Sequence, residues 1–340
     1  MTHEFIHIVK AFTQAKLKGF KSVLVTVVDL DGSSYRKPGV RMLIHENGDM
    51  VGAVSGGCVE KEILRQSLSV FKTDKPKIIT YDGRFRLGCE GFLYILIEPF
   101  NPQNEFFKVF EACIKNRSIF EITSEYYREE GVFDTIGTYI TINSSDYILS
   151  QNNAIKTFKG TENLSFSQTM QPRFKLIIFG AEHDASNLCQ FAALTGWEVH
   201  VVNKPSESKS INDFPGASQF ISSEPEHLEL SIEDKQTAVM IMTHSFAHDL
   251  KCLMALKDSK PVYIGLLGPV NKRENLLSQL LEYSPEIDNA FLDCIYGPAG
   301  LNIGSVTPQE ISISIISEIL TVTRQKTPMS LKEKTGNIHA

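Results

Sequence analysis

The sequence predicts an α/β protein with two parts: an N-terminal mixed α/β domain and a C-terminal Rossmann-like domain built on a doubly wound parallel sheet. The second half alternates apolar strand segments with helical segments, as in the strand at 174–179 followed by the helix at 183–196. Alternation at these lengths is typical of a parallel sheet covered by helices on both faces. The first half instead has the pair Asn47-Gly48 between two apolar segments, which is a strong hairpin signal.

The boundary between the two parts is expected in a polar stretch. Residues 151–172 are rich in Asn, Ser, Thr and Gln and end at Pro172, a composition that favours a linker. We therefore expect a first domain at 1–150, a linker at 151–172, a second domain at 173–325 and a disordered tail at 326–340.

The individual elements follow from the hydrophobic pattern. In the first domain, helices are expected at 3–18, 58–71 and 103–116, and strands at 22–30, 40–45, 50–54, 77–81, 92–98, 119–127 and 138–150, the last as a hairpin. In the second domain, further strands at 198–203, 237–242 and 262–267 alternate with helices at 246–257 and 270–281. Thr307-Pro308-Gln309-Glu310 predicts another helix start, with Thr as the cap, Pro at the first position and Glu at the third.

Composition excludes several classes of function. The 340 residues carry 34 basic and 40 acidic side chains, and this net charge of −6 gives no global reason to expect nucleic-acid binding. No segment reaches the roughly 20 apolar residues that span a bilayer, and the N-terminus lacks the pattern of a signal peptide, so we expect a cytoplasmic location. Six cysteines without a CxxC pair predict neither a disulfide framework nor a zinc site of known spacing.

Residues 55–60 are the most informative stretch, because two glycines and a cysteine stand at the expected start of a helix. Ser55, Gly56 and Gly57 precede Cys58, and backbone N–H groups at a helix start attract an anion or stabilise a thiolate. The stretch is therefore an anion cradle, a reactive cysteine site, or both. The alternative is a tight strand-to-helix turn whose cysteine is simply small and buried.

A second loop, at residues 32–39, offers positive charge. A thiolate and a bound phosphate repel each other, so a site that holds both needs cations. The loop and its neighbour supply two hydroxyls and three cations, from Ser33, Ser34, Arg36, Lys37 and Arg41. Such a set suits a phosphate or another anionic group, although an ordinary exposed turn would look the same.

A third loop contains Gly88 and Cys89 at the entry to a strand. The glycine permits close approach of the backbone to a ligand, and the cysteine again offers sulfur. A bulge before a buried strand is the structural alternative.

The expected Rossmann turn begins at Gly180 but departs from the usual dinucleotide fingerprint. Glu182 occupies the position of the middle glycine, and Asn203 stands where an acidic residue usually binds the ribose. Both departures make NAD(P) binding doubtful and favour a Rossmann-like scaffold without conventional dinucleotide binding.

The segment after the strand at 237–242 holds two histidines four residues apart. His244 and His248 could share a helical face as metal ligands do, with Asp249 near them. Helix capping or hydrogen bonding to a ligand are the alternatives for the same residues. Because the segment follows a parallel strand, it is expected at the sheet edge where ligands usually bind.

Taken together, these segments resemble the xanthine dehydrogenase accessory factors, the XdhC/CoxI-type maturation proteins of molybdenum hydroxylases. The resemblance covers most of the chain, and its two halves occur in the same order. It is carried by Thr26-Val27-Val28, the stretch from Gly32 to Gly39, the stretch from Gly52 to Glu60, Gly88-Cys89, Ile177-Ile178-Phe179-Gly180-Ala181, Met242-Thr243-His244, Gly265-Leu266-Leu267-Gly268, and the stretch from Pro298 to Gly304.

The resemblance implies a function that the residues alone do not. Proteins of this family bind the molybdenum cofactor (molybdopterin), protect it while an oxo ligand is exchanged for a sulfido ligand, and help to insert it into a target enzyme. The implied partners are a xanthine dehydrogenase-like molybdenum hydroxylase and a cysteine desulfurase or other sulfurtransferase, and a homodimer is left open. The cofactor is a phosphorylated pterin dithiolene, which suits an anion cradle beside sulfur residues.

The leading hypothesis is therefore a maturation chaperone rather than an enzyme. Its predicted cofactor-binding residues are Ser33, Ser34, Arg36, Ser55, Gly56, Gly57, Cys58, Gly88, Cys89, Gly180 and His244. The chain departs from the family at Glu90, where a second glycine is common, and at Glu182 and Asn203. An NAD(P)-linked oxidoreductase and an interaction scaffold that binds no ligand remain the alternatives.

Overall fold

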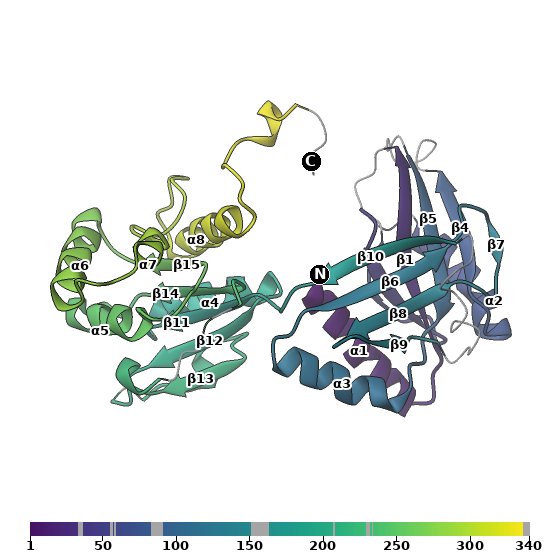
Figure 1. Cartoon of the computed structure of the whole chain (residues 1–340), viewed down its shortest axis with the longest axis horizontal. Coiled ribbons are helices and arrows are strands. Elements are labelled where there is room, and N and C mark those ends of the chain that lie inside the picture. The colour runs from purple at the N-terminus through teal and green to yellow at the C-terminus, as the bar shows by residue number, and fades with distance from the viewer. Residues whose placement is uncertain are drawn as a thin grey trace. The chain divides into compact units, whose positions relative to one another are not determined.

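The computed structural model forms two compact units, Met1–Pro172 and Arg173–Ala340 (Figure 1). It describes residues 1–32, 37–54, 57, 59–82, 91–150, 163–206, 208–228, 232 and 234–335. Among the helices of these residues, none combines the length and the hydropathy needed to cross a membrane.

The first unit contains a six-stranded sheet in which every neighbouring pair is antiparallel. Its order is β3-β2-β1-β5-β4-β7. The strands are β1 (Ser22–Gly32), β2 (Arg41–His45), β3 (Met50–Gly52), β4 (Lys77–Asp82), β5 (Gly91–Pro99) and β7 (Gly131–Val132). The hairpin expected at Asn47-Gly48 is confirmed, since it joins β2 to β3 and the His45 N–H donates to the Asp49 carbonyl at 2.9 Å.

A four-stranded antiparallel sheet completes the first unit, in the order β10-β6-β8-β9. Its strands are β6 (Phe120–Tyr126), β8 (Gly137–Ile142), β9 (Ser145–Ile148) and β10 (Leu164–Met170). β10 lies inside the range 151–172 that we expected to be a linker, and this part of the expectation is wrong. The polar composition of β10 belongs to an edge strand, which pairs with β6 along its whole length and leaves alternate side chains exposed.

The first unit has three helices among its described residues: α1 (Thr2–Leu17) and α2 (Glu60–Thr73) pack on the six-stranded sheet, and α3 (Asn104–Lys115) packs on β8 of the four-stranded sheet. The central strand β1 is apolar on both faces, as expected for a strand covered on both sides. Val23, Val25 and Val27 face a cluster that includes Ile63 of α2. Leu24 faces the other cluster, where phenylalanines of α1, α3 and β6 pack together.

The second unit confirms the predicted doubly wound parallel sheet, with the order β13-β12-β11-β14-β15-β16. Numbered from the first strand of the unit, this is the Rossmann order 3-2-1-4-5-6. The strands are β11 (Lys175–Phe179), β12 (Glu198–Asn203), β13 (Gln219–Ser222), β14 (Thr237–Ile241), β15 (Tyr263–Leu266) and β16 (Ile295–Tyr296).

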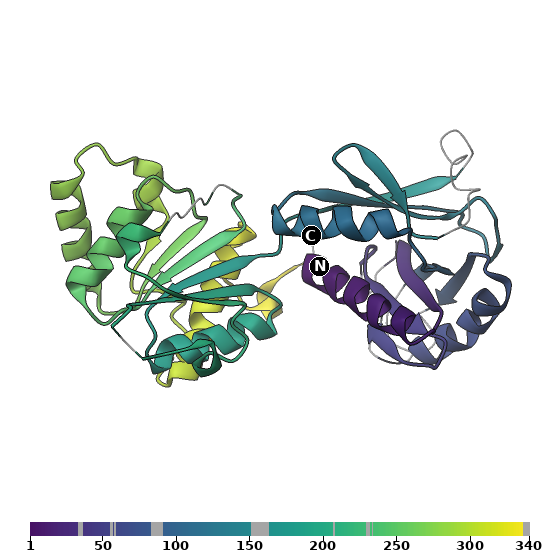
Figure 2. The ribbon, with the colours of Figure 1, turned by 90° about the horizontal axis from the view of Figure 1, so that it is seen from below.

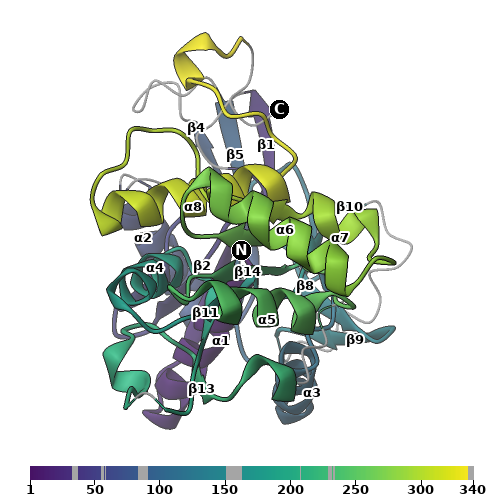
Figure 3. The ribbon, with the colours of Figure 1, turned by 90° about the vertical axis from the view of Figure 1, so that its left-hand side faces the viewer.

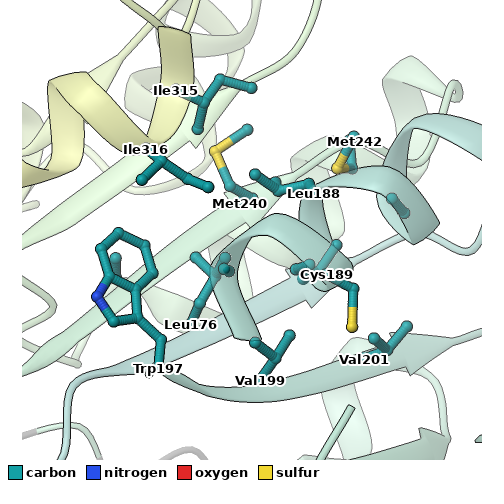
Figure 4. Packing of buried hydrophobic residues seen from close by; sticks show 14 of the residues in the cluster. Leu176, Leu188, Cys189, Trp197, Val199, Val201, Met240, Met242, Ile315 and Ile316 are labelled. Atoms are coloured by element: carbon teal, nitrogen blue, oxygen red, sulfur yellow. The ribbon is translucent and has the colours of Figure 1, made fainter. Parts of the chain in front are cut away.

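Helices cover both faces of this sheet (Figure 2). α4 (His183–Leu194) and α8 (Pro308–Thr323) pack on one face through Leu188, Cys189, Ile315 and Ile316 (Figure 4). α5 (Phe246–Leu256), α6 (Val270–Tyr283) and α7 (Asn289–Asp293) cover the other face (Figure 3). Short 3-10 turns add η3 (Ile211–Asp213), η4 (Pro225–His227) and η5 (Leu331–Glu333).

The predicted start of α8 is confirmed in detail. The Thr307 side chain accepts from the Glu310 backbone N–H, and the Glu310 carboxylate accepts from the Thr307 N–H at 2.9 Å. This reciprocal capping satisfies helix donors that have no partner within the helix. After α8, the range expected as a disordered tail contains η5, whose first turn is capped by Ser330.

Candidate functional site

Strand pairing in the first unit brings the ends of two candidate loops together. Gly32, the last residue of β1, pairs with Gly91, the first residue of β5. Asp82, the last residue of β4, pairs with Phe92. The attachment points of residues 33–36 and 83–90 are therefore neighbours at one edge of the six-stranded sheet (Figure 1).

The third candidate stretch follows β3, which runs in the same direction as β1. Gly52, at the end of β3, pairs with Met42 near the start of β2, and Met42 pairs with Val25 in the middle of β1. Val54 and Val59, which flank residues 55–58, are both fully buried in the cluster between the sheet and α2. The described backbone thus makes the attachment points of residues 33–36 and 83–90 neighbours, and the third stretch leaves β3 toward the same end of the sheet from the level of the middle of β1.

Most residues predicted to bind the cofactor at this edge lie outside the described residues. They are Ser33, Ser34, Arg36, Ser55, Gly56, Cys58, Gly88 and Cys89. Of the first-unit set, Gly57 is described, and its φ of +112° is in the region that favours glycine. No heavy atom of the described residues lies within 4 Å of the position that a Cβ at Gly57 would occupy, so no described side chain fills that position.

The start of α2 carries negative charge of its own. Glu60 and Glu62 stand in its first turn, and Glu60 is only 8% exposed. Acidic side chains at this position complement the helix dipole, and they make the same helix start a poorer place for a phosphate. A bound phosphate is better placed at the cationic loop than at the first turn of α2.

Arg41 does not have the role that its position in the sequence suggested. We expected it to add to the surface charge of the loop at 32–39, but it is 7% exposed and lies between the two sheets. Its Nη1 donates to the Gly39 carbonyl at 2.9 Å and to Gln168 Oε1 at 2.5 Å. Arg41 therefore ties the returning end of the loop to β10 rather than presenting a free cation.

Glu98 is fully buried and lies close enough to Arg41 for the two charges to interact. Its carboxylate accepts from the Thr138 N–H at 2.8 Å and from the Thr138 hydroxyl at 2.5 Å. Burial raises the pKa of Glu98 to about 7, although these hydrogen bonds and the attraction of Arg41 oppose the change. Within the described structure, Nε and Nη2 of Arg41 have no hydrogen-bond partner.

The cysteines of the described chain are poor nucleophiles. Burial raises the pKa of Cys113 and Cys252, and it raises the pKa of Cys189 and Cys294 to about 11. These thiols are therefore protonated near neutral pH, and a thiol is much less reactive than a thiolate. Any thiolate chemistry of this chain consequently depends on Cys58 and Cys89, which lie outside the described residues.

A hollow of about 800 Å³ lies at the opposite end of the six-stranded sheet, where β1 begins and β5 ends. Its walls contain Phe12 and Phe71 and two ion pairs, Lys21–Asp74 at 3.2 Å and Lys75–Asp134 at 3.0 Å. The described residues that line it include no cysteine, and both of these lysines are already paired with carboxylates. Its size alone does not make it a candidate site.

In the second unit, Gly180 stands at the switch point of the sheet, between β11 and β14. Its φ is +123°, and a Cβ there would lie 2.4 Å from the Met242 carbonyl oxygen. Only glycine permits this approach of two backbones. Its position agrees with the first glycine of a Rossmann turn, which forms the tight turn after the first strand.

The remaining dinucleotide positions do not offer the usual contacts. Glu182 is the exposed N-cap residue of α4, so its carboxylate stands at the helix start where a pyrophosphate would bind. Asn203 is 4% exposed, and within the described structure its Nδ2 has no hydrogen-bond partner. This amide is buried, whereas ribose recognition needs a side chain that reaches the ligand.

His244 and His248 do not share the helical face that a pair of metal ligands would need. His244 precedes the helix with a φ of +55°, while Ser245 caps α5 by accepting from the His248 N–H. His244 is about half exposed, and its Nε2 lies 4.0 Å from Asp184. His248 is buried and faces Glu224 at 3.9 Å, and burial lowers its pKa. In the described part of the chain, no group of three or more side chains is arranged to hold a metal ion.

Asp249 instead organises this edge of the sheet together with Lys272, a residue that no sequence motif indicated. Asp249 is fully buried, forms an ion pair with Lys272, and accepts from the Thr243 hydroxyl at 2.5 Å. Lys272 also donates to the Leu267 carbonyl at 3.0 Å. The available signal was a lysine in the first turn of α6, where the helix dipole disfavours a cation unless a carboxylate is near.

Lys272 and Leu267 border a small cavity of about 370 Å³ at the ends of β14 and β15. It is lined by Met242, His244, Phe246, Leu267, Gly268, Pro269 and Lys272. The buried carboxylate of Asp249 holds both Thr243 and Lys272 in place, so it positions the wall of the cavity without lining it. The volume lies at the low end of the range of about 300–1,000 Å³ that is usual for small-molecule sites.

Comparison with known proteins agrees with this two-unit organisation. Residues 17–82 match the family model described as the XdhC and CoxI family, and residues 176–319 match the XdhC Rossmann domain. A protein of Bacillus subtilis, named as a probable xanthine dehydrogenase subunit, is 29% identical over 88% of this chain and 92% of its own length. The molybdenum cofactor insertion chaperone PaoD of Escherichia coli is 21% identical over 95% of this chain and 90% of its own length.

A solved structure shares the fold over nearly the whole chain. It is a crystal structure from Bacillus halodurans described as a xanthine dehydrogenase, with a TM-score of 0.76, 25% identity, and coverage of 94% of this chain and 96% of that one. Both family models and this structure match the order of the two units. The chain therefore belongs to the XdhC and CoxI family, and its second unit is an XdhC Rossmann domain.

Proposed function

We propose that this protein binds the molybdenum cofactor at the loop-bearing edge of its first unit and delivers it to a xanthine dehydrogenase-like molybdenum hydroxylase. Two relatives support a role in maturing such an enzyme. One is named for insertion of the molybdenum cofactor, and the other is named as a probable subunit of xanthine dehydrogenase. Both extend over most of this chain and most of their own length.

The observation that carries the proposal is the shared edge of the six-stranded sheet. The pairs Gly32–Gly91 and Asp82–Phe92 make the attachment points of the cationic serine loop and of the second glycine-cysteine loop neighbours. β3 runs toward the same end of the sheet and leads into the first glycine-cysteine stretch. A ligand with both a phosphate and sulfur atoms needs cations, hydroxyls and soft contacts in one place, and these three stretches contain those residue types.

We assign each part of the cofactor to the residues whose chemistry suits it. Cys58 is the main sulfur contact and Cys89 the second, while Gly56 and Gly57 offer backbone N–H groups. Ser33, Ser34 and Arg36 hold the phosphate or the pterin, since the first turn of α2 already carries two carboxylates. Ser55 and Gly88 complete the two glycine-cysteine stretches.

The remaining thiols of the described chain support this assignment by their burial. With the pKa of Cys113, Cys189, Cys252 and Cys294 raised, these groups are not available as sulfur ligands at neutral pH. A sulfurtransferase is accordingly the proposed donor of the sulfido ligand, because no described residue supplies that sulfur. We further propose Gly180 and His244 as ligand contacts of the second unit, where His244 lines the cavity at the ends of β14 and β15.

Delivery is tested by transfer to an apo-enzyme. The protein is isolated from cells that make molybdenum cofactor, separated from free cofactor, and mixed with a cofactor-free xanthine dehydrogenase under anaerobic conditions. We expect hydroxylase activity to appear in proportion to the cofactor that the protein carries. Protein isolated from cells unable to make the cofactor is the control. If the loaded protein activates the apo-enzyme no better than this control, delivery is not its function.

A further inference from the structure

Tyr81 carries a buried hydroxyl that no hydrogen bond explains. Tyr81 is the next-to-last residue of β4, and its ring packs against the apolar cluster between the six-stranded sheet and α2. Its Oη is closed to solvent and, within the described structure, has no hydrogen-bond partner. A buried hydroxyl left unpaired costs about 1–3 kcal/mol, so such a group in a folded protein needs a reason.

The position of Tyr81 connects it to the proposed site. Tyr81 pairs with Leu93 of β5, and Leu93 pairs with Leu30 near the end of β1. This row crosses the sheet within two or three residues of the edge that bears the candidate loops. Its side chains face the same cluster as Val54 and Val59, the residues that flank positions 55–58.

The direction of α2 places its first turn at the same edge. Lys21, just before β1, donates to the Phe71 carbonyl near the end of α2 at 3.2 Å. Lys77, at the start of β4, donates to Gln66 in the middle of the helix at 2.6 Å. The helix therefore ends where β1 begins, and it starts at the edge where β4 ends with Tyr81.

We propose that the Tyr81 hydroxyl donates a hydrogen bond to the molybdenum cofactor when it is bound, an inference that rests on the proposed function. The cofactor offers anionic oxygen and sulfur acceptors, and a phenol hydroxyl is a donor for either. A neutral hydroxyl suits this position better than a lysine or arginine, because a full charge beside the apolar cluster would cost far more to bury. We therefore expect the Tyr81 hydroxyl, which has no partner within the described structure, to gain its hydrogen-bond acceptor when the cofactor binds.

The test compares Tyr81→Phe with Tyr94→Phe. Tyr94 lies on the neighbouring strand β5, and the two residues alternate onto opposite faces of the sheet, so it is a matched control. Each variant is loaded with cofactor released from purified xanthine dehydrogenase, and the bound pterin and molybdenum are measured against dilution. We expect Tyr81→Phe to bind about tenfold more weakly than the unchanged protein, as for loss of one hydrogen bond to a charged acceptor, and Tyr94→Phe to bind normally.

Thermal unfolding of the free variants separates ligand binding from a structural role. Because Phe removes an unpaired hydroxyl and keeps the ring, free Tyr81→Phe should melt at the same temperature as the unchanged protein or higher. Equal binding by Tyr81→Phe, with binding lost in Cys58→Ala, would refute the role of Tyr81 while leaving the proposed function intact. A lowered melting temperature would also refute it, since the hydroxyl would then have a partner in the free protein. Failure of every form to bind would refute the proposed function itself.

Discussion

Replacing Asp249 with Asn is expected to lower the free energy of unfolding of the second unit by about 3–5 kcal/mol, the cost of breaking a buried ion pair from one side. Asp249 is fully buried, and Lys272, which pairs with it, is only 19% exposed. The substitution leaves the Lys272 charge without a counter-charge and weakens the hydrogen bonds from Thr243. Denaturant unfolding followed by the fluorescence of Trp197 measures this, because the chain has a single tryptophan and it lies in the core of the second unit.

The partner variant and the double variant check the cause. Lys272→Met alone should also destabilise the unit, because it leaves a buried carboxylate unpaired. Asp249→Asn combined with Lys272→Met should cost clearly less than the sum of the two single changes. If Asp249→Asn costs less than about 1 kcal/mol, or if the two effects simply add, the ion pair does not hold this edge of the sheet.

The stability of the first unit is expected to fall as the pH rises from about 4.5 to about 7, by up to about 3 kcal/mol from Glu98 alone. The pKa of Glu98 is about 7 in the folded protein and near 4.5 when unfolded. Between these values the unfolded chain has released the proton and the folded chain still holds it, so rising pH favours unfolding. The contribution is complete below pH 4.5 and is lost as the pH passes 7.

Glu98→Gln removes this dependence and provides the comparison. A glutamine oxygen can still accept from the Thr138 N–H, and the Thr138 hydroxyl, which lies 2.8 Å from the Ser124 hydroxyl, can turn to accept from the amide. Hydrogen exchange of peptides from β1 and β5, read by mass spectrometry, reports the local stability. The two proteins are compared at each pH, so that the intrinsic pH dependence of exchange cancels. Parallel profiles for the two proteins would show that Glu98 does not titrate in this range.

The fold was largely predictable because its strongest signals are local. Asn47-Gly48 supplies the conformations that a tight hairpin needs, and Thr307-Pro308-Gln309-Glu310 supplies every group of a helix cap. The alternation of strands and helices in the second half likewise determines a parallel sheet. β10 was missed because an edge strand with one exposed face has the composition of a polar linker, and its partner β6 lies almost 40 residues away in the sequence.

The residues around the candidate sites were harder to predict, since their roles depend on contacts between distant segments. Arg41 looks like a surface cation beside a loop, and only the packing of the two sheets shows that it is buried against Gln168. His244 and His248 have helical spacing, yet the left-handed backbone at His244 removes it from the helix. Lys272 is 23 residues from Asp249, so nothing near either residue indicates that they pair.

The central claim is that the first unit holds the molybdenum cofactor through Cys58. The cofactor content of the isolated protein tests this claim most directly. The unchanged protein, Cys58→Ala and Cys294→Ala are purified from the same cofactor-producing cells, and the molybdenum and the pterin per chain are measured. Cys294 is a partly buried thiol of the second unit that donates to the Phe291 carbonyl at 3.0 Å, so its removal controls for the loss of a cysteine. We predict similar contents for the unchanged protein and Cys294→Ala, and at least a roughly tenfold lower content for Cys58→Ala. Full cofactor content in Cys58→Ala would contradict the account.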